Sequence, residues 1–338
     1  MTAVGLAGPG SGIAVPGLVD LQVNGFGGVD FLNADVEAYG RANAALARTG
    51  VVAYQPTLIT SRPEQTVAAL ETAAKAQAVE GGARILGVHL EGPFLSAERP
   101  GTHPVDLLRD PDPDLLQRLL VAGPVTQVTL APELLGALEV IGACVAAGVL
   151  VACGHSDATA AEAHAAFDRG ARSVTHLFDA MRPFTHRDPG IAGVALTRDE
   201  VYVGLIADPS HVGPEAVQLA FHAARDRVVL VTDALAPAGC PDGHYRLGDV
   251  EFDVAAGTAR RADGTLVGTT ITLLEAIRDA HAAGVPLEAA ANAATRTPAR
   301  LFPASGIGLL RPGDRADVVV LDDALNLRTV LLGGAEPA

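Results

Sequence analysis

The sequence contains no tryptophan, and aromatic residues make up only 4% of its 338 residues. Basic residues are also scarce, since 24 Lys and Arg stand against 39 Asp and Glu, for a formal net charge of -15. Nucleic-acid-binding domains present basic stripes, so this composition argues against a nucleic-acid partner. The same charge repels an anionic substrate at long range, so a phosphate group would need a local cationic site.

Long apolar runs and paired cysteines are missing as well. No run is long enough to cross a bilayer, and the first residues lack the charged region of a signal peptide, so we expect a cytoplasmic protein with no membrane partner. The three cysteines, Cys144, Cys153 and Cys240, show no CxxC spacing. The sequence therefore predicts neither a disulfide framework nor a thiolate zinc site.

What is present is a regular alternation of short apolar runs with amphipathic segments, which is typical of stacked βαβ units. Eight runs read as strands, and this number favours a closed (β/α)8 barrel of the TIM type over an open doubly wound sheet. They lie at residues 18–22, 51–55, 85–90, 125–130, 149–153, 172–175, 201–206 and 228–232. Helices are predicted at 36–49, 63–80, 269–283 and 287–301.

The rest of the chain is organised around this barrel. We predict a short N-terminal segment at 1–15, the barrel at 16–305 with a hairpin excursion at 240–265, and a small β domain at 306–338. The last part contains strand-like stretches at 317–321 and 328–332 without helices between them. The sequence therefore predicts an α/β protein with a small β-sandwich domain that is short of N-terminal strands.

Three metal-ligating side chains follow predicted strands. His155 and His176 each come directly after a β-branched run, and Glu91 follows the run that ends at residue 90. In a (β/α)8 barrel the carboxyl ends of all strands meet on one rim, so these side chains can converge on one cation. A lone histidine there is more often a core residue, and a salt bridge to an arginine is the alternative for Glu91. The matched positions favour a catalytic metal site.

Further candidates lie on the same rim. Asp233 follows the eighth strand, where it can accept a proton from a metal-bound water and pass it to a leaving group. The alternative is a structural one, the capping of a helix or turn. His103 and His211 are weaker candidates, and Arg187 can grip a phosphate through two hydrogen bonds but can also be an ordinary surface arginine.

The first strand predicts one metal ion rather than two. Barrel hydrolases with two metals usually carry a His-x-His pair here, whereas this chain has Gln22 and Asn24. Neutral amides bind divalent transition metals poorly. Imidazole and carboxylate ligands accept zinc, our first expectation, and also iron, manganese or cobalt.

Several segments together resemble the N-acetylglucosamine-6-phosphate deacetylase family of the amidohydrolase superfamily. They include PGLVDLQVNGFGG, GVHLEGPFLS, GTHP, GHSDAT, THLFDAMRPFTHRDPG and LVTDALAPAG, in order along nearly the whole chain. The resemblance implies a homodimer that removes acetate from an amino sugar phosphate. It implies that Glu91, His155 and His176 bind the metal and that Asp233 is the catalytic acid and base, while His103 or the metal would stabilise the oxyanion. The residues implied around the sugar phosphate are Thr102, His103, Asp179, Ala180, Arg187, Asp208, His211, Leu266, Val267 and Gly268, with Arg187 able to act on the partner subunit.

The chain departs from the family in three places. Asp179 stands where the family has asparagine, and its charge would oppose a phosphate. Pro209 and Ser210 stiffen the loop before His211. The segment before Pro16 is short, so we expect unpaired edges on the C-terminal strands.

These departures keep other functions open. The same amide hydrolysis could act on an unphosphorylated N-acetyl amino sugar or an N-acyl amino acid. A non-catalytic barrel that binds a sugar phosphate is a second alternative, which would not need the ligands and Asp233 together. A metal-free isomerase barrel leaves Glu91, His155 and His176 unexplained.

Overall fold

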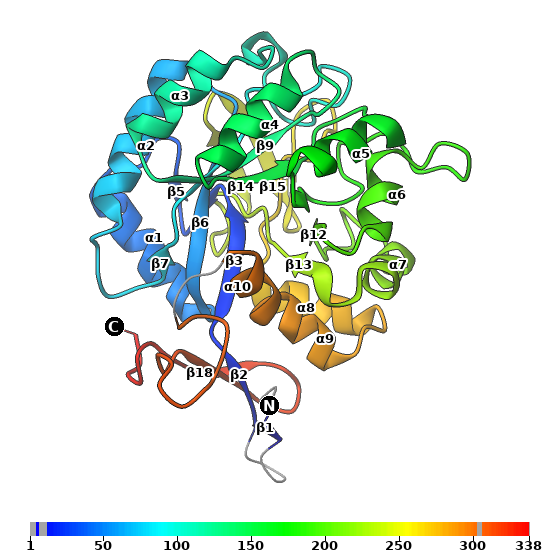
Figure 1. The fold of residues 1–338 in the computed structure, drawn as a ribbon. Coiled ribbons are helices and arrows are strands. Elements are labelled where there is room, and N and C mark those ends of the chain that lie inside the picture. The colour runs from blue at the N-terminus through cyan, green and yellow to red at the C-terminus, as the bar shows by residue number, and fades with distance from the viewer. Residues whose placement is uncertain (1–4, 7–11, 303–305, 338) are drawn as a thin grey trace.

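The computed structural model describes residues 5–6, 12–302 and 306–337. It consists of a barrel of parallel strands surrounded by helices, with a small antiparallel sheet below it as drawn in Figure 1. Within the described residues, no helix is both long enough and apolar enough to span a membrane.

Eight parallel strands follow one another in the barrel in the order β13-β12-β11-β10-β9-β8-β6-β3. Their bounds are β3 Leu18–Val23, β6 Val51–Ile59, β8 Val88–Glu91, β9 Val125–Leu130, β10 Leu150–Cys153, β11 Ser173–Val174, β12 Tyr202–Leu205 and β13 Val228–Leu230. The ends of β3 and β13 meet through a parallel bridge between Val23 and Ala234 and a hydrogen bond of 2.9 Å from Asp233 N to Gln22 O. The sheet is therefore closed, and the predicted TIM-type barrel is confirmed.

The predicted strand at 85–90 is divided in the structure. A two-residue strand, β7 (Arg84–Ile85), pairs only with β6, and β8 begins after Gly87. Gly87 has a φ of 128°, and a Cβ atom there would lie 2.3 Å from Thr126 Oγ1. Only glycine fits this left-handed position, which separates the two strands.

The helices connect the strands and cover the outside of the barrel (Figure 1). They are α1 Val36–Arg48, α2 Pro63–Ala76, α3 Pro113–Ala122, α4 Ala137–Ala146, α5 Ala160–Arg169, α6 Gly190–Thr197, α7 Pro214–Ala224, α8 Leu273–Ala282, α9 Leu287–Ala293 and α10 Arg296–Leu301, with short 3₁₀ turns η1 Val105–Leu107 and η2 Arg225–Arg227. The single helix predicted at 287–301 is two helices, because Pro298 has no N–H for the carbonyl of Ala294. Thr159 begins α5 in a capping box with Glu162, directly after the loop that carries His155.

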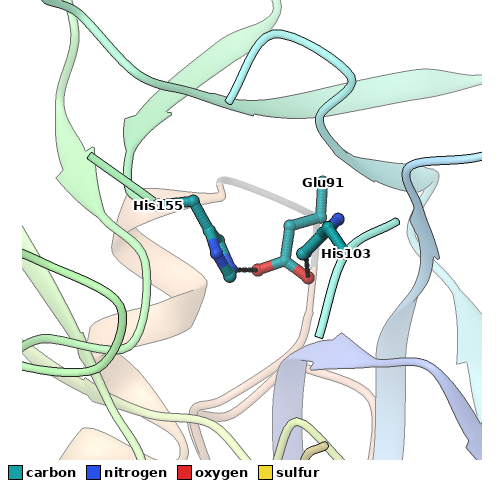
Figure 2. A group of neighbouring side chains, drawn as sticks. All are labelled: Glu91, His103 and His155. Atoms are coloured by element: carbon teal, nitrogen blue, oxygen red, sulfur yellow. Dashed lines mark ion pairs between the residues drawn. The ribbon is translucent and has the colours of Figure 1, made fainter. Parts of the chain in front are cut away.

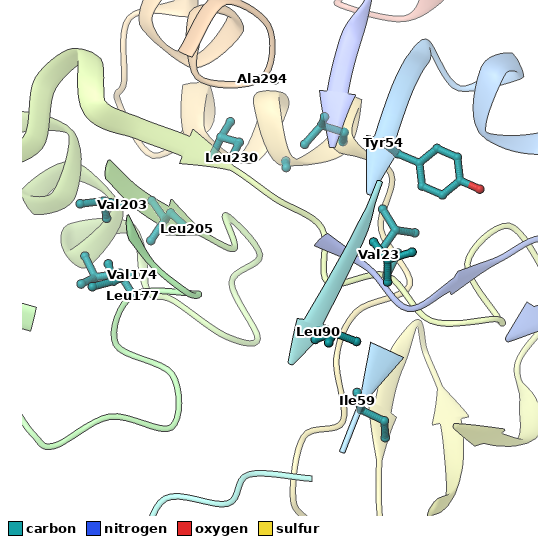
Figure 3. Close-up of a cluster of buried hydrophobic side chains, with 14 of the residues drawn as sticks. Val23, Tyr54, Ile59, Leu90, Val174, Leu177, Val203, Leu205, Leu230 and Ala294 are labelled. Atoms are coloured by element: carbon teal, nitrogen blue, oxygen red, sulfur yellow. The ribbon is translucent and has the colours of Figure 1, made fainter. Parts of the chain in front are cut away.

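Buried aliphatic side chains hold the barrel and its helices together. Figure 3 shows part of this core, in which Val23, Leu90, Val174, Leu205 and Leu230 are at most 2% exposed. These residues come from five different strands, so the core fixes the strands relative to one another and thereby fixes the rim on which the polar side chains lie.

The small sheet contains strands from both ends of the described chain, in the order β1-β2-β17-β18. The strands are β1 Gly5–Leu6, β2 Ile13–Pro16, β17 Val318–Leu321 and β18 Leu327–Leu331. Because β17 pairs with β2 on one side and β18 on the other, the expectation that the C-terminal strands have no N-terminal partner is wrong for β17. The sequence missed β2 because this short apolar run directly precedes the first barrel strand.

The excursion after β13 is a three-stranded antiparallel sheet. It contains β14 Gly243–Leu247, β15 Val250–Ala255 and β16 Thr258–Arg260, one strand more than the predicted hairpin. A two-stranded pair, β4 Gly25–Phe26 and β5 Val29–Asp30, follows the first barrel strand.

Candidate active site

Three donor atoms converge at the carboxyl ends of β8, β10 and β11. Nε2 of His176 lies 3.0 Å from Oε1 of Glu91 and 3.0 Å from Nε2 of His155, and Nε2 of His155 lies 3.3 Å from the same glutamate oxygen. Tetrahedral ligands about 2.0–2.1 Å from a zinc ion are about 3.3 Å apart. These three atoms therefore fit one face of a tetrahedral site for a divalent cation.

His103 approaches the other oxygen of the same carboxylate. Figure 2 shows Glu91 between His155 and His103, with Nε2 of His103 3.6 Å from Oε2. The donor atoms of Glu91, His103 and His155 also lie within 4.8 Å of one another, so this second trio could hold an ion by distance alone. However, the main-chain N–H of Thr60 donates to Nδ1 of His103 at 3.3 Å. A neutral His103 then carries its proton on Nε2, so it is a hydrogen-bond donor rather than a ligand.

Local contacts prepare the other two histidines to bind a cation. Nδ1 of His155 lies 3.1 Å from the carbonyl oxygen of Arg99 and donates to it, which leaves the lone pair on Nε2. Burial lowers the pKa of His155 to about 4. Burial opposes ionisation of Glu91, yet its close contacts with the imidazoles, first among them that of His103, hold the pKa of its carboxyl well below its usual range.

The cluster also attracts positive charge. Burial alone would lower the pKa of His176, but its hydrogen bond to Glu91 raises that pKa to about 9. Two imidazole Nε2 atoms 3.0 Å apart with both lone pairs facing each other would repel, so a proton or a metal ion has to lie between them. The donor set thus fits a divalent metal by its chemistry as well as by its distances.

Two amide side chains hold Asp233, one on β3 and one on the residue directly after β3. Its Oδ1 accepts hydrogen bonds from Nε2 of Gln22 at 3.0 Å and Nδ2 of Asn24 at 2.7 Å. Within the described part of the chain, no hydrogen bond reaches Oδ2. Burial, together with the negative charge of Glu91, raises the pKa of Asp233 to about 6. This carboxylate can therefore take up and release a proton near neutral pH through its free oxygen.

Gln22 also donates to Oε1 of Glu91 at 3.1 Å. It therefore connects the candidate ligand to the candidate proton carrier, a function that the sequence did not reveal. From the sequence, Gln22 and Asn24 are recognisable only as poor metal ligands. The pattern that could have identified them is their i, i+2 spacing on a predicted barrel strand, which points both side chains into the barrel mouth.

These groups open into a cavity of about 420 Å³, which is the size range of small-molecule sites. Most residues predicted around the substrate line it: Thr102, His103, Asp179, Ala180, His211, Leu266, Val267 and Gly268. The described residues contain eight buried side-chain atoms without a hydrogen-bond partner, and four of them belong to residues that line this cavity: Asn24 Oδ1, Thr102 Oγ1, His176 Nδ1 and Asp179 Oδ2. Such a concentration indicates a site for a polar ligand.

Two predicted residues do not line the cavity. Asp208 lies behind His211, whose Nδ1 is 3.3 Å from Oδ2 of Asp208. Arg187 is exposed on the loop between Met181 and α6, away from the cavity. The sequence also missed Arg99, which does line the cavity and pairs with Asp157 at 2.8 Å.

The amidohydrolase family profile matches residues 13–336. A human N-acetylglucosamine-6-phosphate deacetylase is 41% identical over 342 residues, which cover 96% of this chain and 83% of the human protein. An N-acetylgalactosamine-6-phosphate deacetylase of Escherichia coli O157:H7 is 37% identical over 324 residues, 94% of this chain and 86% of its own length.

Solved structures agree with these relatives. The N-acetyl-D-glucosamine-6-phosphate deacetylase of Mycobacterium smegmatis, in complex with N-acetyl-D-glucosamine-6-phosphate, superposes with a TM-score of 0.92 and 39% identity over 96% of this chain and 87% of that one. The Thermotoga maritima enzyme of the same name gives 0.90 and 30% identity over 97% of this chain and 89% of that one.

Proposed function

Because this chain belongs to the amidohydrolase family and, within it, to the N-acetylglucosamine-6-phosphate deacetylases, we propose that it hydrolyses the acetamide of N-acetylglucosamine 6-phosphate to glucosamine 6-phosphate and acetate. The observation that carries the proposal is the meeting of Glu91, His155 and His176 beside Asp233 at the bottom of a polar cavity.

We propose that Glu91, His155 and His176 hold one divalent cation in each chain, with zinc first and iron, manganese or cobalt as alternatives. Such a cation polarises an amide carbonyl and lowers the pKa of a water molecule. The amides of Gln22 and Asn24 occupy the positions where a second ion would need imidazoles, and both already donate to carboxylates. This supports a single ion.

In the proposed reaction, Oδ2 of Asp233 takes a proton from the attacking water, because Oδ1 is engaged by Gln22 and Asn24. His103 lines the cavity, and its Nε2–H, whose contact with Oε2 of Glu91 is a long one of 3.6 Å, also donates to the carbonyl oxygen as negative charge develops on it. As the C–N bond breaks, Asp233 returns its proton to the departing amine.

We propose that a phosphate group is bound with help from a second subunit. The basic side chains that line the cavity already have acidic neighbours, since Arg99 pairs with Asp157 and His211 contacts Asp208. Arg187 is exposed on a loop and does not line the cavity, a position from which it can reach a neighbouring chain in a homodimer.

We also predict that the protein is cytoplasmic.

A second candidate substrate is an unphosphorylated N-acetyl amino sugar. Asp179 lines the cavity, and its buried Oδ2 has no hydrogen-bond partner. A free carboxylate oxygen accepts a hydrogen bond from a sugar hydroxyl and repels a phosphate.

Acetate release from N-acetylglucosamine 6-phosphate, its galacto epimer and unphosphorylated N-acetylglucosamine, each with and without a chelator, tests the proposal. We expect the highest kcat/KM for the phosphorylated gluco compound and no turnover with chelator. A preference for either other compound would replace the substrate, and chelator-resistant turnover would reject the proposed metal chemistry.

A further inference from the structure

A chain of four buried polar side chains crosses the barrel one layer below the candidate metal ligands. Nδ1 of His89 lies 3.1 Å from Oγ1 of Thr57, and Nε2 of His89 lies 2.7 Å from Oγ1 of Thr129. Oγ1 of Thr129 lies 2.6 Å from Oγ1 of Thr175. All four residues are at most 3% exposed, and they come from β6, β8, β9 and the end of β11. We call Thr57, His89, Thr129 and Thr175 the sublayer network.

The hydrogen bonds of the sublayer network have a consistent direction. The main-chain N–H of Val23 donates to Oγ1 of Thr57 at 3.2 Å. The hydroxyl of Thr57 can then donate to Nδ1 of His89, and Nε2–H of His89 donates to Thr129. With its oxygen accepting from His89, the hydroxyl of Thr129 can in turn donate to Thr175. This arrangement uses one donor and one acceptor of a neutral imidazole and leaves neither ring nitrogen of His89 unpaired.

Two of the candidate ligands are one or two residues from a member of this network, and the residue before the third packs against it. His89 precedes Glu91 by two positions on β8, so both side chains point to the same side of the sheet. Thr175 directly precedes His176. Gly154, directly before His155, packs against Thr129 and Thr175. A Cβ atom at Gly154 would lie 2.9 Å from Cβ of Thr175 and 3.1 Å from Cγ2 of Thr129.

Two of the ligands need such support because their backbones are strained. His155 has a φ of 46° and His176 a φ of 28°, a region that residues with a Cβ atom rarely adopt. Such conformations are costly and persist only where the surroundings hold them.

We propose that the sublayer network positions Glu91, His155 and His176, so that His89 and Thr129 determine cation affinity although neither touches the cation. The inference rests on the proposed function only through the cation site. Loss of the Thr129 hydroxyl leaves Nε2–H of His89 without its acceptor and removes the side-chain hydrogen bond between Thr129 on β9 and Thr175 at the end of β11.

The variant Thr129→Val keeps the shape of the side chain and removes the hydroxyl, and Thr129→Ser restores the hydroxyl. Thr126→Val is the matched control, because Thr126 lies on the same strand and its hydroxyl also bonds a side chain, Gln55, at 2.8 Å. If Thr129→Val is insoluble, Thr57→Val tests the other end of the network. The readouts are affinity of metal-free protein for Zn²⁺ or Co²⁺ and the visible absorption spectrum of the Co²⁺ form.

We expect Thr129→Val to weaken cation affinity about tenfold or more and to change the Co²⁺ spectrum, with Thr129→Ser close to wild type. Thr126→Val should change neither quantity. kcat should fall more than KM rises. Unchanged affinity and spectrum in Thr129→Val, or equal effects in Thr126→Val, would overturn the inference. These binding readouts need no substrate, so a protein that binds one cation but releases no acetate contradicts only the proposed function.

Discussion

Replacement of Asp233 by asparagine should separate the chemistry of this residue from its cost to stability. The carbonyl oxygen of an asparagine can take the place of Oδ1 and still accept the hydrogen bonds from Gln22 and Asn24. Its NH2 group then faces the cavity and cannot accept a proton. The geometry of the site is preserved while the proton carrier is lost.

The expected loss of activity follows from this change. A positioned acid and base contributes about 10²–10⁴ in rate, which corresponds to roughly 3–5 kcal/mol of transition-state stabilisation. Because Asp233 hydrogen-bonds none of the three proposed ligands directly, cation content should stay at one ion per chain.

Whereas activity should fall, the stability of Asp233→Asn relative to wild type should rise with pH. Burial raises the pKa of Asp233 from 3.8 to about 6. The folded state therefore favours the protonated carboxyl, and the associated stability is present below pH 3.8 and is lost as the pH rises through about 6. At about 1.4 kcal/mol per pKa unit, the full difference is on the order of 3 kcal/mol, and somewhat less than half of it falls between pH 5 and pH 8.

Denaturant unfolding of metal-free wild type and Asp233→Asn at about pH 5 and about pH 8 measures this difference. The variant should gain free energy of unfolding over wild type between the two pH values, whereas Asp323→Asn, at an exposed aspartate, should not. Retained turnover in Asp233→Asn would refute the reasoning, and so would a free energy of unfolding of the variant that does not rise relative to wild type between the two pH values.

Three further predictions concern the cation, the substrate and the second subunit. Chelation should abolish acetate release and one equivalent of Zn²⁺ should restore it, since Gln22 and Asn24 offer no imidazole; metal analysis that finds two ions per chain would contradict this. Asp179→Asn should lower KM for the phosphorylated sugar by up to about tenfold relative to the unphosphorylated one; an unchanged ratio of kcat/KM values would show that Asp179 does not face the phosphate. Mixed Arg187→Ala and Asp233→Asn chains, each weakly active alone, should regain activity if Arg187 serves the partner, and mixtures that stay as inactive as their components would place Arg187 outside the site.

The barrel and the convergence of the proposed metal ligands on its rim could be predicted from the sequence because both depend on local patterns. Buried parallel strands are nearly continuous apolar runs, so the eight strands are visible without any knowledge of their contacts. Glu91, His155 and His176 directly follow such runs, and a closed parallel barrel gathers the ends of its strands on one rim. The convergence of these residues therefore needs only the order of the strands.

The partners of these residues could not be predicted, because they are set by long-range contacts. Gln22 donates to a carboxylate 69 positions away and to another 211 positions away. No local sequence pattern around Gln22 predicts either contact. The ends of two predicted elements were wrong for a different reason. The breaks at Gly87 and before Pro298 depend on single residues within otherwise regular patterns.

Backbone strain explains why the chemistry lies where it does. His155, His176 and Asp233 all have positive φ values, of 46°, 28° and 51°. At about 1–3 kcal/mol each, they cost roughly 3–9 kcal/mol, a large share of the 5–15 kcal/mol by which a typical domain is stable. Within a strand such residues would also break ladder hydrogen bonds. All three lie just beyond the last residues of β10, β11 and β13, where the buried layers beneath hold the strands in place. The ends of the barrel strands are thus the positions at which strained, polar and chemically useful residues cost the fold least.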